Sequence, residues 1–359
     1  MKKTLLFSVA FVLMFSLLTG CGAGTATSTT TAAASTTAAA ADGVKDPSTI
    51  TIAWLPNNAG EDFKDARVEI EKVIENATGL KVEEKLTTDY AILIEAMASG
   101  EAQLAYCGAQ QYVEAHNKNG KVVPLVANSG SSGTLDDAIY YSRFCVKKGN
   151  EAEYQNGSDY SIDKMAGKKI AFVSNSSTSG FKVPTSAIIA NFSKQDQWKN
   201  LKQEDLLEGG EGKLFSQVIF GGSHQLSAVS LLTGKADVAA FDDIDLVSYV
   251  DLTSGTDNVP GAVYTVKQGA DDPFGALAGQ QYVVIKAMAV MNGPMMANSG
   301  ALSQKTLDAI KTALISDAVT NNPKIFLPKD AQYKGMFNQP QKFLPVEDKW
   351  YDPIRELSK

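Results

Sequence analysis

The sequence has little of what metal enzymes and nucleic-acid-binding proteins usually need. Its 359 residues include only two histidines and three cysteines, and these are not grouped at the spacings of a zinc site. Acidic residues outnumber basic ones, which gives a net charge of −7 at pH 7 and argues against nucleic acid as a partner. We therefore expect no metal ion, no cofactor and no nucleic acid.

Long apolar runs are also absent after the N-terminus, so no later segment is expected to span a bilayer. Near the start, two lysines precede an almost wholly apolar run over residues 5–18. This run is too short for a permanent membrane helix and is typical of a signal peptide. It ends in Leu-Thr-Gly-Cys, which resembles a bacterial lipobox and implies cleavage before Cys21 and a lipid on its thiol. We predict a lipoprotein signal peptide over residues 1–20; the alternative is a secreted protein that is cut elsewhere.

The segment after Cys21 lacks the side chains that build a core. Residues 22–45 are almost all Ala, Thr, Ser and Gly, and such a segment cannot bury enough apolar surface to order itself. As a random coil it would span roughly 25–30 Å. We predict a lipidated cysteine and a disordered tether over residues 21–47, which would hold the folded part beside the outer face of a membrane.

From residue 48 onward the sequence alternates between strand and helix patterns. Residues 48–54 alternate as a strand, residues 61–77 form an amphipathic helix pattern that Gly79 would end, and residues 80–86 form a second strand pattern. Asp89 is a candidate N-cap for the next helix. This alternation predicts an α/β fold with largely parallel sheets.

Two segments, 91–108 and 225–242, repeat the same pattern of helix, glycine and short apolar strand when Gly100 and Gly234 are aligned. The similarity is either chance between two αβ units or the mark of one unit in each of two similar lobes. In the second case the strand ends and helix starts of both units would face a common cleft, because open α/β sheets bind ligands there.

A cluster of hydroxyl groups stands between a strand-like run and a helix-like run. Residues 174–180 read S-N-S-S-T-S-G. Free N–H groups and the helix dipole make a helix start a ready anion site, and Ser177, Thr178 and Ser179 would add donors where Gly180 allows close approach. Helix capping is the alternative, but three hydroxyls exceed what one cap uses. Since no phosphate-binding loop pattern is present, we predict an uncharged cradle for a tetrahedral oxyanion.

Two further candidates follow other strands of the sequence. His224 follows Gly-Gly-Ser at another strand-to-helix turn and could donate to an oxyanion from a neutral or a cationic ring. Asp242 follows the strand pattern 236–241 and would select a ligand that carries a proton on one oxygen. Asp243 and Asp245 are expected to form a solvated acidic turn.

Tyrosines supply the remaining candidate donors. Tyr90 stands at a helix start directly after Asp89. Tyr140 or Tyr141 offers a second hydroxyl on an apolar ring.

Together these elements resemble the PhnD-like solute-binding proteins of ABC importers for phosphonate, phosphite and phosphate. The matching stretches, in the family's order, are Asp89-Tyr-Ala91, Leu104-Ala-x-x-Gly108, Tyr140-Tyr-Ser142, Gly167-Lys-Lys-Ile-Ala-Phe-Val173, Ser177-Thr-Ser-Gly-Phe-x-Val-Pro184, Gly222-Ser-His224, Gly234-x-x-Asp-Val-Ala-Ala240, Asn292-Gly-Pro294, Phe343-Leu-Pro-Val346 and Tyr351-Asp-Pro-Ile-Arg-Glu-Leu357. The resemblance covers nearly all of residues 48–357.

The resemblance implies a type II periplasmic-binding-protein fold, in which two α/β lobes joined by two crossing strands enclose a ligand cleft. It implies that residues 48–145 and 283–359 form lobe 1 and that residues 146–282 form lobe 2. The expected crossings are Ser142–Val146 and Tyr282–Ala287. It further implies that the oxyanion is held by Ser177, Thr178 and Ser179, with Tyr90, Tyr140 and His224 closing the cleft.

The sequence departs from the family pattern at three points. Members that take aminoalkyl phosphonates carry acidic residues where Ile244 and Gly293 stand here, which argues against an aminophosphonate. Residues 255–279 look like an inserted Gly/Asp-rich loop, for which we have no functional interpretation.

Cys107 and Cys145 are expected to be buried free thiols, although a disulfide between them stays open.

We therefore predict a monomeric, lipid-anchored extracytoplasmic protein that captures a small phosphorus oxyanion for an ABC permease and its ATPase, without catalysing a reaction. Alternative ligands are another tetrahedral oxyanion or an organophosphonate with a neutral tail. A hydrolase that uses Ser177 or Ser179 with His224 and Asp242, and a tethered sensor or adhesin, are the alternatives from other classes.

Overall fold

The computed structural model describes residues 43–331 and 335–357. The predicted signal peptide, Cys21 and most of the predicted tether lie outside the described residues. Within the described ranges, no helix is both long and apolar enough to cross a membrane. The last tether residues belong to the fold, because the Asp46 carboxylate accepts hydrogen bonds from the Ser303 N–H at 2.7 Å and from the Ser303 and Thr306 hydroxyls at 2.8 Å each.

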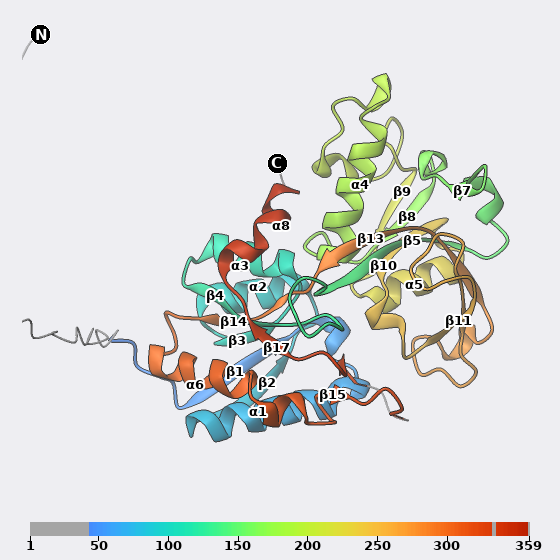
Figure 1. Cartoon of the computed structure of the whole chain (residues 1–359). Helices are drawn as coiled ribbons and strands as arrows, with labels where there is room; N and C mark the ends of the chain where they lie inside the picture. Colours follow the sequence, from blue (N-terminus) through green and yellow to red (C-terminus); the bar gives the residue numbers. More distant parts are fainter. Residues whose placement is uncertain (1–42, 332–334, 358–359) are drawn as a thin grey trace, which may run out of the picture. The chain divides into compact units, whose positions relative to one another are not determined.

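One lobe is built on a six-stranded sheet with the order β17-β4-β14-β3-β1-β2 (Figure 1). Strand β1 pairs in parallel with β2 and β3, whereas β14 runs antiparallel to β3 and β4. The strands of this sheet are β1 (Thr49–Trp54), β2 (Lys81–Leu86), β3 (Leu104–Tyr106), β4 (Val122–Asn128), β14 (Pro294–Asn298) and β17 (Phe343–Pro345). Its main helices are α1 (Lys64–Thr78), α2 (Tyr90–Ser99), α3 (Ala109–Lys118) and α6 (Gln304–Leu314).

The other lobe is built on a seven-stranded sheet with the order β11-β12-β13-β5-β10-β8-β9. Its strands are β5 (Ile139–Lys147), β8 (Lys169–Phe172), β9 (Gln217–Phe220), β10 (Val238–Asp242), β11 (Val250–Ser254), β12 (Val263–Val266) and β13 (Gln281–Met291), with helices α4 (Val183–Phe192) and α5 (His224–Leu232). The remaining short elements are β6 (Gln155–Asn156), β7 (Asp159–Tyr160), β15 (Phe326–Leu327), β16 (Phe337–Asn338), α7 (Asp317–Thr320) and α8 (Asp352–Glu356).

Both faces of the six-stranded sheet are buried. In β1, Ile52 and Trp54 pack in a cluster with residues of α1 and α6, while Ala53 packs in a second cluster with residues of α2 and α3. Successive strand residues point to opposite faces, so each face of the strand contributes to a separate core. The last three residues of β1, Ile52, Ala53 and Trp54, are accordingly all buried.

Local signals in the sequence set the helix ends as predicted. Helix α1 stops at Gly79, whose backbone adopts the left-handed conformation with φ 71°. Helix α2 begins after Asp89, whose side chain accepts a hydrogen bond from the Ala91 N–H at 2.7 Å. The repeated pattern is also structural: α2, Gly100 and β3 lie in one lobe, and α5, Gly234 and β10 lie in the other.

The chain changes sheet at positions that differ from the expected crossings. Strands β5 and β13 pair with each other from Ile139 to Lys147, with a bulge at Ile285, and both lie in the seven-stranded sheet. A strand can leave its sheet only beyond the last paired residues of its ladder. The changes therefore fall between Asn128 and Ile139 and between Met291 and Pro294, outside Ser142–Val146 and Tyr282–Ala287.

Residues 255–279 are not only a loop. Strand β12 lies inside this segment and pairs antiparallel with both β11 and β13, which extends the edge of the seven-stranded sheet. The turn before β12 is held by the buried Arg143, whose guanidinium donates to Asn258 Oδ1 at 2.6 Å and Asp257 Oδ1 at 3.0 Å.

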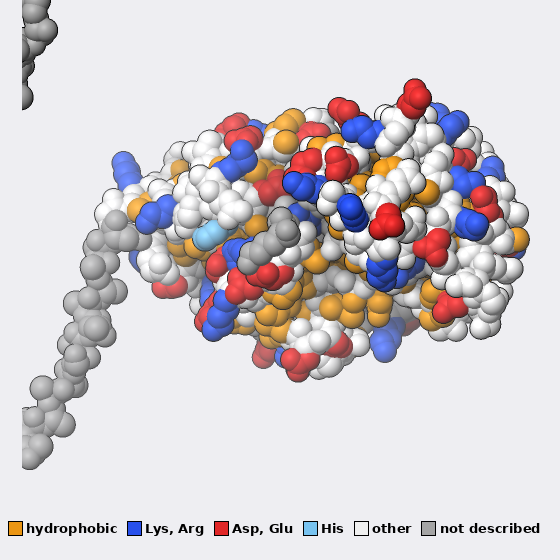
Figure 2. All heavy atoms as spheres, turned by 90° about the horizontal axis from the view of Figure 1, so that it is seen from above, with side chains coloured by type: hydrophobic (Ala, Val, Ile, Leu, Met, Phe, Trp, Pro, Cys, Tyr) orange, Lys and Arg blue, Asp and Glu red, His pale blue; other side chains and the backbone are white. Residues whose placement is uncertain are grey.

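The face of the molecule in Figure 2 carries acidic and basic side chains side by side. The excess of acidic residues is not gathered there into one strongly charged patch.

Candidate functional site

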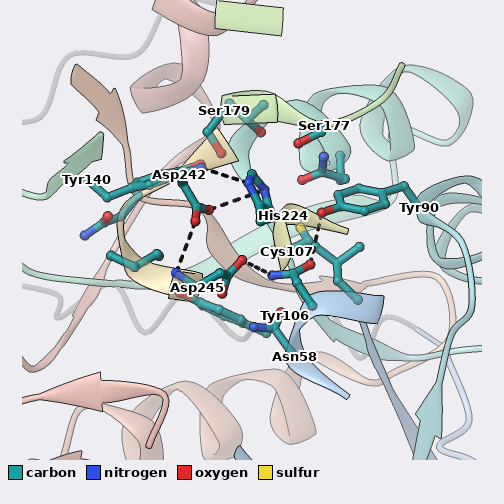
Figure 3. A pocket seen from close by; sticks show the side chains of 18 residues that line it. Asn58, Tyr90, Tyr106, Cys107, Tyr140, Ser177, Ser179, His224, Asp242 and Asp245 are labelled. Carbon is teal, nitrogen blue, oxygen red and sulfur yellow. Dashed lines mark hydrogen bonds and ion pairs between the residues drawn. The ribbon is translucent and has the colours of Figure 1, made fainter. Parts of the chain in front are cut away.

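A cavity of about 50 Å³ lies between the two sheets and is lined by residues from both lobes (Figure 3). This is room for roughly three to five water-sized groups, so it suits a small ion. All seven ligand candidates predicted from the sequence line it, namely Tyr90, Tyr140, Ser177, Thr178, Ser179, His224 and Asp242. Among the lining residues none is a lysine or an arginine.

The hydroxyl turn forms one wall of the cavity and opens a helix as expected. Ser177 caps the helix start through its Oγ, which accepts from the Gly180 N–H at 3.0 Å. Residues Thr178–Lys182 then form a π-helical turn that leads into α4, a distortion that often occurs at functional sites. Gly180 is needed for packing, since a Cβ at that position would lie 2.3 Å from the Val173 side chain.

Two of the three hydroxyls accept hydrogen bonds from backbone N–H groups. Besides Ser177, Thr178 Oγ1 accepts from the Gln110 N–H at 2.9 Å, which joins the turn to α3 of the other lobe. A hydroxyl that accepts one hydrogen bond can still donate its proton. The turn therefore both contributes donors to the cavity and helps to hold the two lobes together.

His224 is held as a neutral ring. Its Nδ1 accepts from the Asp242 N–H at 2.9 Å, so the ring hydrogen resides on Nε2, which lies 3.3 Å from Asp242 Oδ2. Burial lowers the pKa of His224 to about 3, which excludes the cationic alternative near neutral pH. Because both ring nitrogens contact Asp242, the imidazole is not placed as a base for Ser177 or Ser179.

Asp242 and Asp245 form a buried acidic pair next to His224. Asp242 Oδ1 accepts from the Asp245 N–H at 3.1 Å, and Asp245 Oδ2 accepts from Asn57 Nδ2 at 2.6 Å. Burial raises the pKa of Asp242 to about 7 and raises the pKa of Asp245 well above its usual value. Two adjacent buried carboxyls cannot both ionise freely, so the pair retains a proton near neutral pH.

The expectation of a solvated acidic turn at Asp243 and Asp245 was wrong. The short helical turn Ile244–Leu246 directs Asp245 into the cavity, where only 5% of its surface stays exposed. Asp243 accepts from the Tyr141 N–H at 2.8 Å and from Asn258 Nδ2 at 3.0 Å, and burial raises its pKa to about 6.

The ligand atoms of His224, Asp242 and Asp245 lie within 4.8 Å of one another, an arrangement that could also hold a cation. This cluster of His224, Asp242 and Asp245 was not predicted from the sequence, because Asp245 was expected at the surface.

Tyr90 joins the two lobes through Asn57, a residue that was not among the predicted candidates. The Tyr90 hydroxyl donates to Asn57 Oδ1 at 3.0 Å, and Asn57 in turn donates to Asp245. Asn57 follows β1 at the carboxyl end of the sheet, so the rule that places ligands at strand ends could have identified it. Of the two neighbouring tyrosines, Tyr140 lines the cavity and Tyr141 does not.

Both positions at which this sequence departs from aminophosphonate-binding members line the cavity. Ile244 presents an apolar side chain, and Gly293 lies so close to Cys107 that a Cβ would be 1.8 Å from the Cys107 carbonyl oxygen. No acidic side chain is therefore accommodated at position 293. Cys107 and Cys145 are free, buried thiols whose pKa values burial raises.

Comparison with known proteins places this architecture in a defined class. Residues 52–351 match the family model of the periplasmic substrate-binding protein of ABC phosphonate transporters. The phosphate-import protein PhnD of Mycolicibacterium smegmatis is 29% identical over 317 residues, which cover 87% of this chain and 85% of that protein.

Two solved structures share the fold. A binding protein component of an ABC phosphonate transporter from Pseudomonas aeruginosa has a TM-score of 0.59 at 18% identity, covering 87% of this chain and 86% of its own. A PhnD protein from Prochlorococcus marinus in complex with methylphosphonate has a TM-score of 0.57 at 16% identity, covering 87% of this chain and 97% of its own.

The fold and the cleft thus define a substrate-binding component of an ABC importer. The chain belongs to the PhnD-like family of periplasmic substrate-binding proteins for phosphonate and phosphate import. The predicted family and the type II periplasmic-binding-protein fold are confirmed. This is a family of transport proteins and not of enzymes.

Proposed function

We propose that this protein binds a small phosphorus oxyanion in the cavity and delivers it, as a lipid-anchored monomer, to an ABC permease and its ATPase. The observation that carries the ligand class is the distribution of donors and acceptors. The hydroxyl groups of Ser177, Thr178 and Ser179 line the same cavity as the proton-holding pair Asp242 and Asp245, and the Ser179 side chain hydrogen-bonds to Asp242. A tetrahedral oxyanion with one protonated oxygen satisfies both.

The hydroxyl groups beside the acidic pair argue against a cation as the ligand, and a lining without lysine or arginine argues against a dianion. A cation would displace the proton of the acidic pair and leave the surrounding hydroxyls without an acceptor. A dianion would place two charges against two carboxyls with no lysine or arginine in the lining. The relatives named for phosphate import and for a methylphosphonate complex support the same ligand class.

The ligand class is tested by a thermal-shift screen of phosphate, phosphite, methylphosphonate, sulfate and 2-aminoethylphosphonate on residues 43–359. A ligand present at 100 times its Kd adds about 2.7 kcal/mol to the free energy of unfolding. We expect one or more of the first three to raise Tm and the last two to have little effect. If none of the phosphorus compounds raises Tm while another ligand class does, the proposal is wrong.

The lipid anchor is tested separately from ligand binding. We expect Cys21→Ser to abolish lipidation and to release the protein from the membrane, because the thiol that carries the lipid is lost. Ligand affinity should stay at the wild-type value, since every lining residue of the cavity lies at Leu55 or beyond. Detergent-phase partitioning measures the change, and a Cys21→Ser protein that still partitions into detergent would refute the anchor.

A further inference from the structure

Residues 255–279, here called the edge segment, line no part of the oxyanion cavity but contact the turn that carries Asp245 into it. This turn, the acidic turn, spans Ile244–Leu246 and begins directly after Asp243. Asn258 in the edge segment donates a hydrogen bond from Nδ2 to Asp243 Oδ2 at 3.0 Å. The edge segment thus holds the residue from which the acidic turn starts.

The edge segment also contacts the other end of the acidic turn. Lys267 donates from Nζ to the carbonyl oxygen of Val247 at 2.8 Å, and Val247 is the residue directly after the turn. The Lys267 N–H donates to the Tyr249 carbonyl oxygen at 2.9 Å, which holds Lys267 itself in place. Both ends of the acidic turn are therefore held by donors from the same segment.

The side chain and the backbone of Asn258 both suit this position. Its Oδ1 accepts from Nε of the buried Arg143 at 2.6 Å, while its Nδ2 donates to Asp243. An amide group offers one acceptor and one donor side, so it can join a guanidinium to a carboxylate, which an apolar side chain cannot do. The backbone φ of Asn258 is 58°, a conformation that asparagine adopts more readily than most residues.

Apolar packing holds the acidic turn only in part. Leu246 is buried, but 47% of the surface of Ile244 and 54% of that of Val247 are exposed, and a cavity of about 310 Å³ lies beside both. Gln225 adds one hydrogen bond to the Asp245 carbonyl oxygen at 3.3 Å. A turn with one buried apolar side chain gains little stability from packing. Hydrogen bonds from the edge segment are therefore needed to fix its position.

The position of the acidic turn decides where the acidic pair lies. Asp242 Oδ1 accepts from the Asp245 N–H at 3.1 Å, and Asp245 Oδ2 accepts from Asn57 Nδ2 at 2.6 Å. A shift of the turn by roughly 1 Å along these bonds would lengthen both beyond hydrogen-bond range. The carboxyl oxygens that meet the ligand would then no longer be held in the cavity.

We propose that the edge segment is a specificity element of the oxyanion site, in which Asn258 and Lys267 are positioning residues that fix the acidic pair for a ligand with one protonated oxygen. The inference rests on the proposed function, because it concerns the acceptor that such a ligand needs. Neither side chain lines the oxyanion cavity, so both act through the acidic turn.

Calorimetric titration of variants with phosphate, phosphite and methylphosphonate tests the proposal. Asn258→Gly removes the amide and keeps the backbone conformation, and Lys267→Met removes the bond to residue 247. We expect each to weaken binding of the phosphorus oxyanion roughly 2- to 12-fold, the contribution of one hydrogen bond. Asn258→Asp keeps the size but offers Asp243 no hydrogen, and it should weaken binding as well.

A matched control and a double-mutant cycle separate positioning from general damage. Thr253→Val removes the side-chain hydrogen bond at 2.8 Å to Thr265 of the edge segment, far from the acidic turn in the hydrogen-bond network, and should bind as the wild type does. In the Asp242→Asn protein the carboxyl that the edge segment positions is already lost. Asn258→Gly should therefore cause little further loss in that background, because residues that act through one another are not additive.

The possible failures are distinguishable. Wild-type affinity in Asn258→Gly or Lys267→Met, an equal loss in Thr253→Val, or a loss that adds fully to that of Asp242→Asn overturns the positioning role. In each of these cases the wild-type protein still binds the phosphorus oxyanion and the proposed function stands. If the wild type binds none of the three ligands, the proposed function fails and the positioning role fails with it.

Discussion

Ser179→Ala is expected to weaken binding of the phosphorus oxyanion about 10- to 150-fold. A hydrogen bond to a charged group contributes roughly 1.5–3 kcal/mol, and a buried oxyanion that loses one donor cannot replace it with water. Ser179 lines the cavity and is only 2% exposed. Ser177 also caps the helix and Thr178 also accepts from Gln110, whereas the Ser179 side chain interacts within the cavity, with Asp242 and Tyr140.

Controls separate the lost donor from general damage to the turn. Ser176→Ala removes a hydroxyl from the same turn outside the cavity lining, and its affinity should equal that of the wild type. Thr178→Ser keeps the hydroxyl and should bind nearly normally, whereas Thr178→Ala should lose both a donor and the bond to α3. Calorimetry on variants with wild-type Tm measures each effect. Wild-type affinity for both Ser179→Ala and Thr178→Ala would place the ligand elsewhere.

Affinity for the phosphorus oxyanion is expected to fall as the pH rises above about 7. The decrease should approach tenfold for each further pH unit. The complex needs a proton between a ligand oxygen and the acidic pair, and burial holds the pKa of Asp242 at about 7. Below that pH the pair or the ligand monoanion carries the proton. Above it, Asp242 and the ligand lose this proton while Asp245 keeps its own, so binding must take one proton up from solution and each pH unit costs a factor of ten. Sulfate brings no proton of its own near neutral pH and should bind more weakly than the phosphorus oxyanions.

Asp242→Asn should weaken binding of the monoanion and flatten this pH profile, because an amide can donate to an unprotonated oxygen. Asp245→Asn tests the second member of the pair. His224 does not confuse the result, since its pKa is held near 3 and its charge does not change in this range. Titrations in buffers with different ionisation enthalpies count the protons taken up. An affinity that stays constant from about pH 6 to 9, or an Asp242→Asn protein with the wild-type profile, would contradict the role of the acidic pair.

Features that depend on neighbouring residues could be predicted from the sequence. The capping residue Asp89, the left-handed Gly79 and the hydroxyl turn before α4 are each defined within a few positions, because N–H groups at a helix start are satisfied locally. The rule that ligands bind at the strand ends of an open α/β sheet, together with the family resemblance for Tyr140, then predicted that seven candidates line one cavity. Their identity and approximate location needed no tertiary information.

Tertiary structure decided how those groups behave chemically. Asp245 reads as a surface residue in the sequence, but Asn57 from the other lobe covers it, and only that burial pairs it with Asp242 and raises its pKa. The tautomer of His224 is set by the Asp242 N–H, eighteen positions away. Burial, pKa and cavity shape depend on which distant segments cover a residue, and no local pattern in the sequence records that.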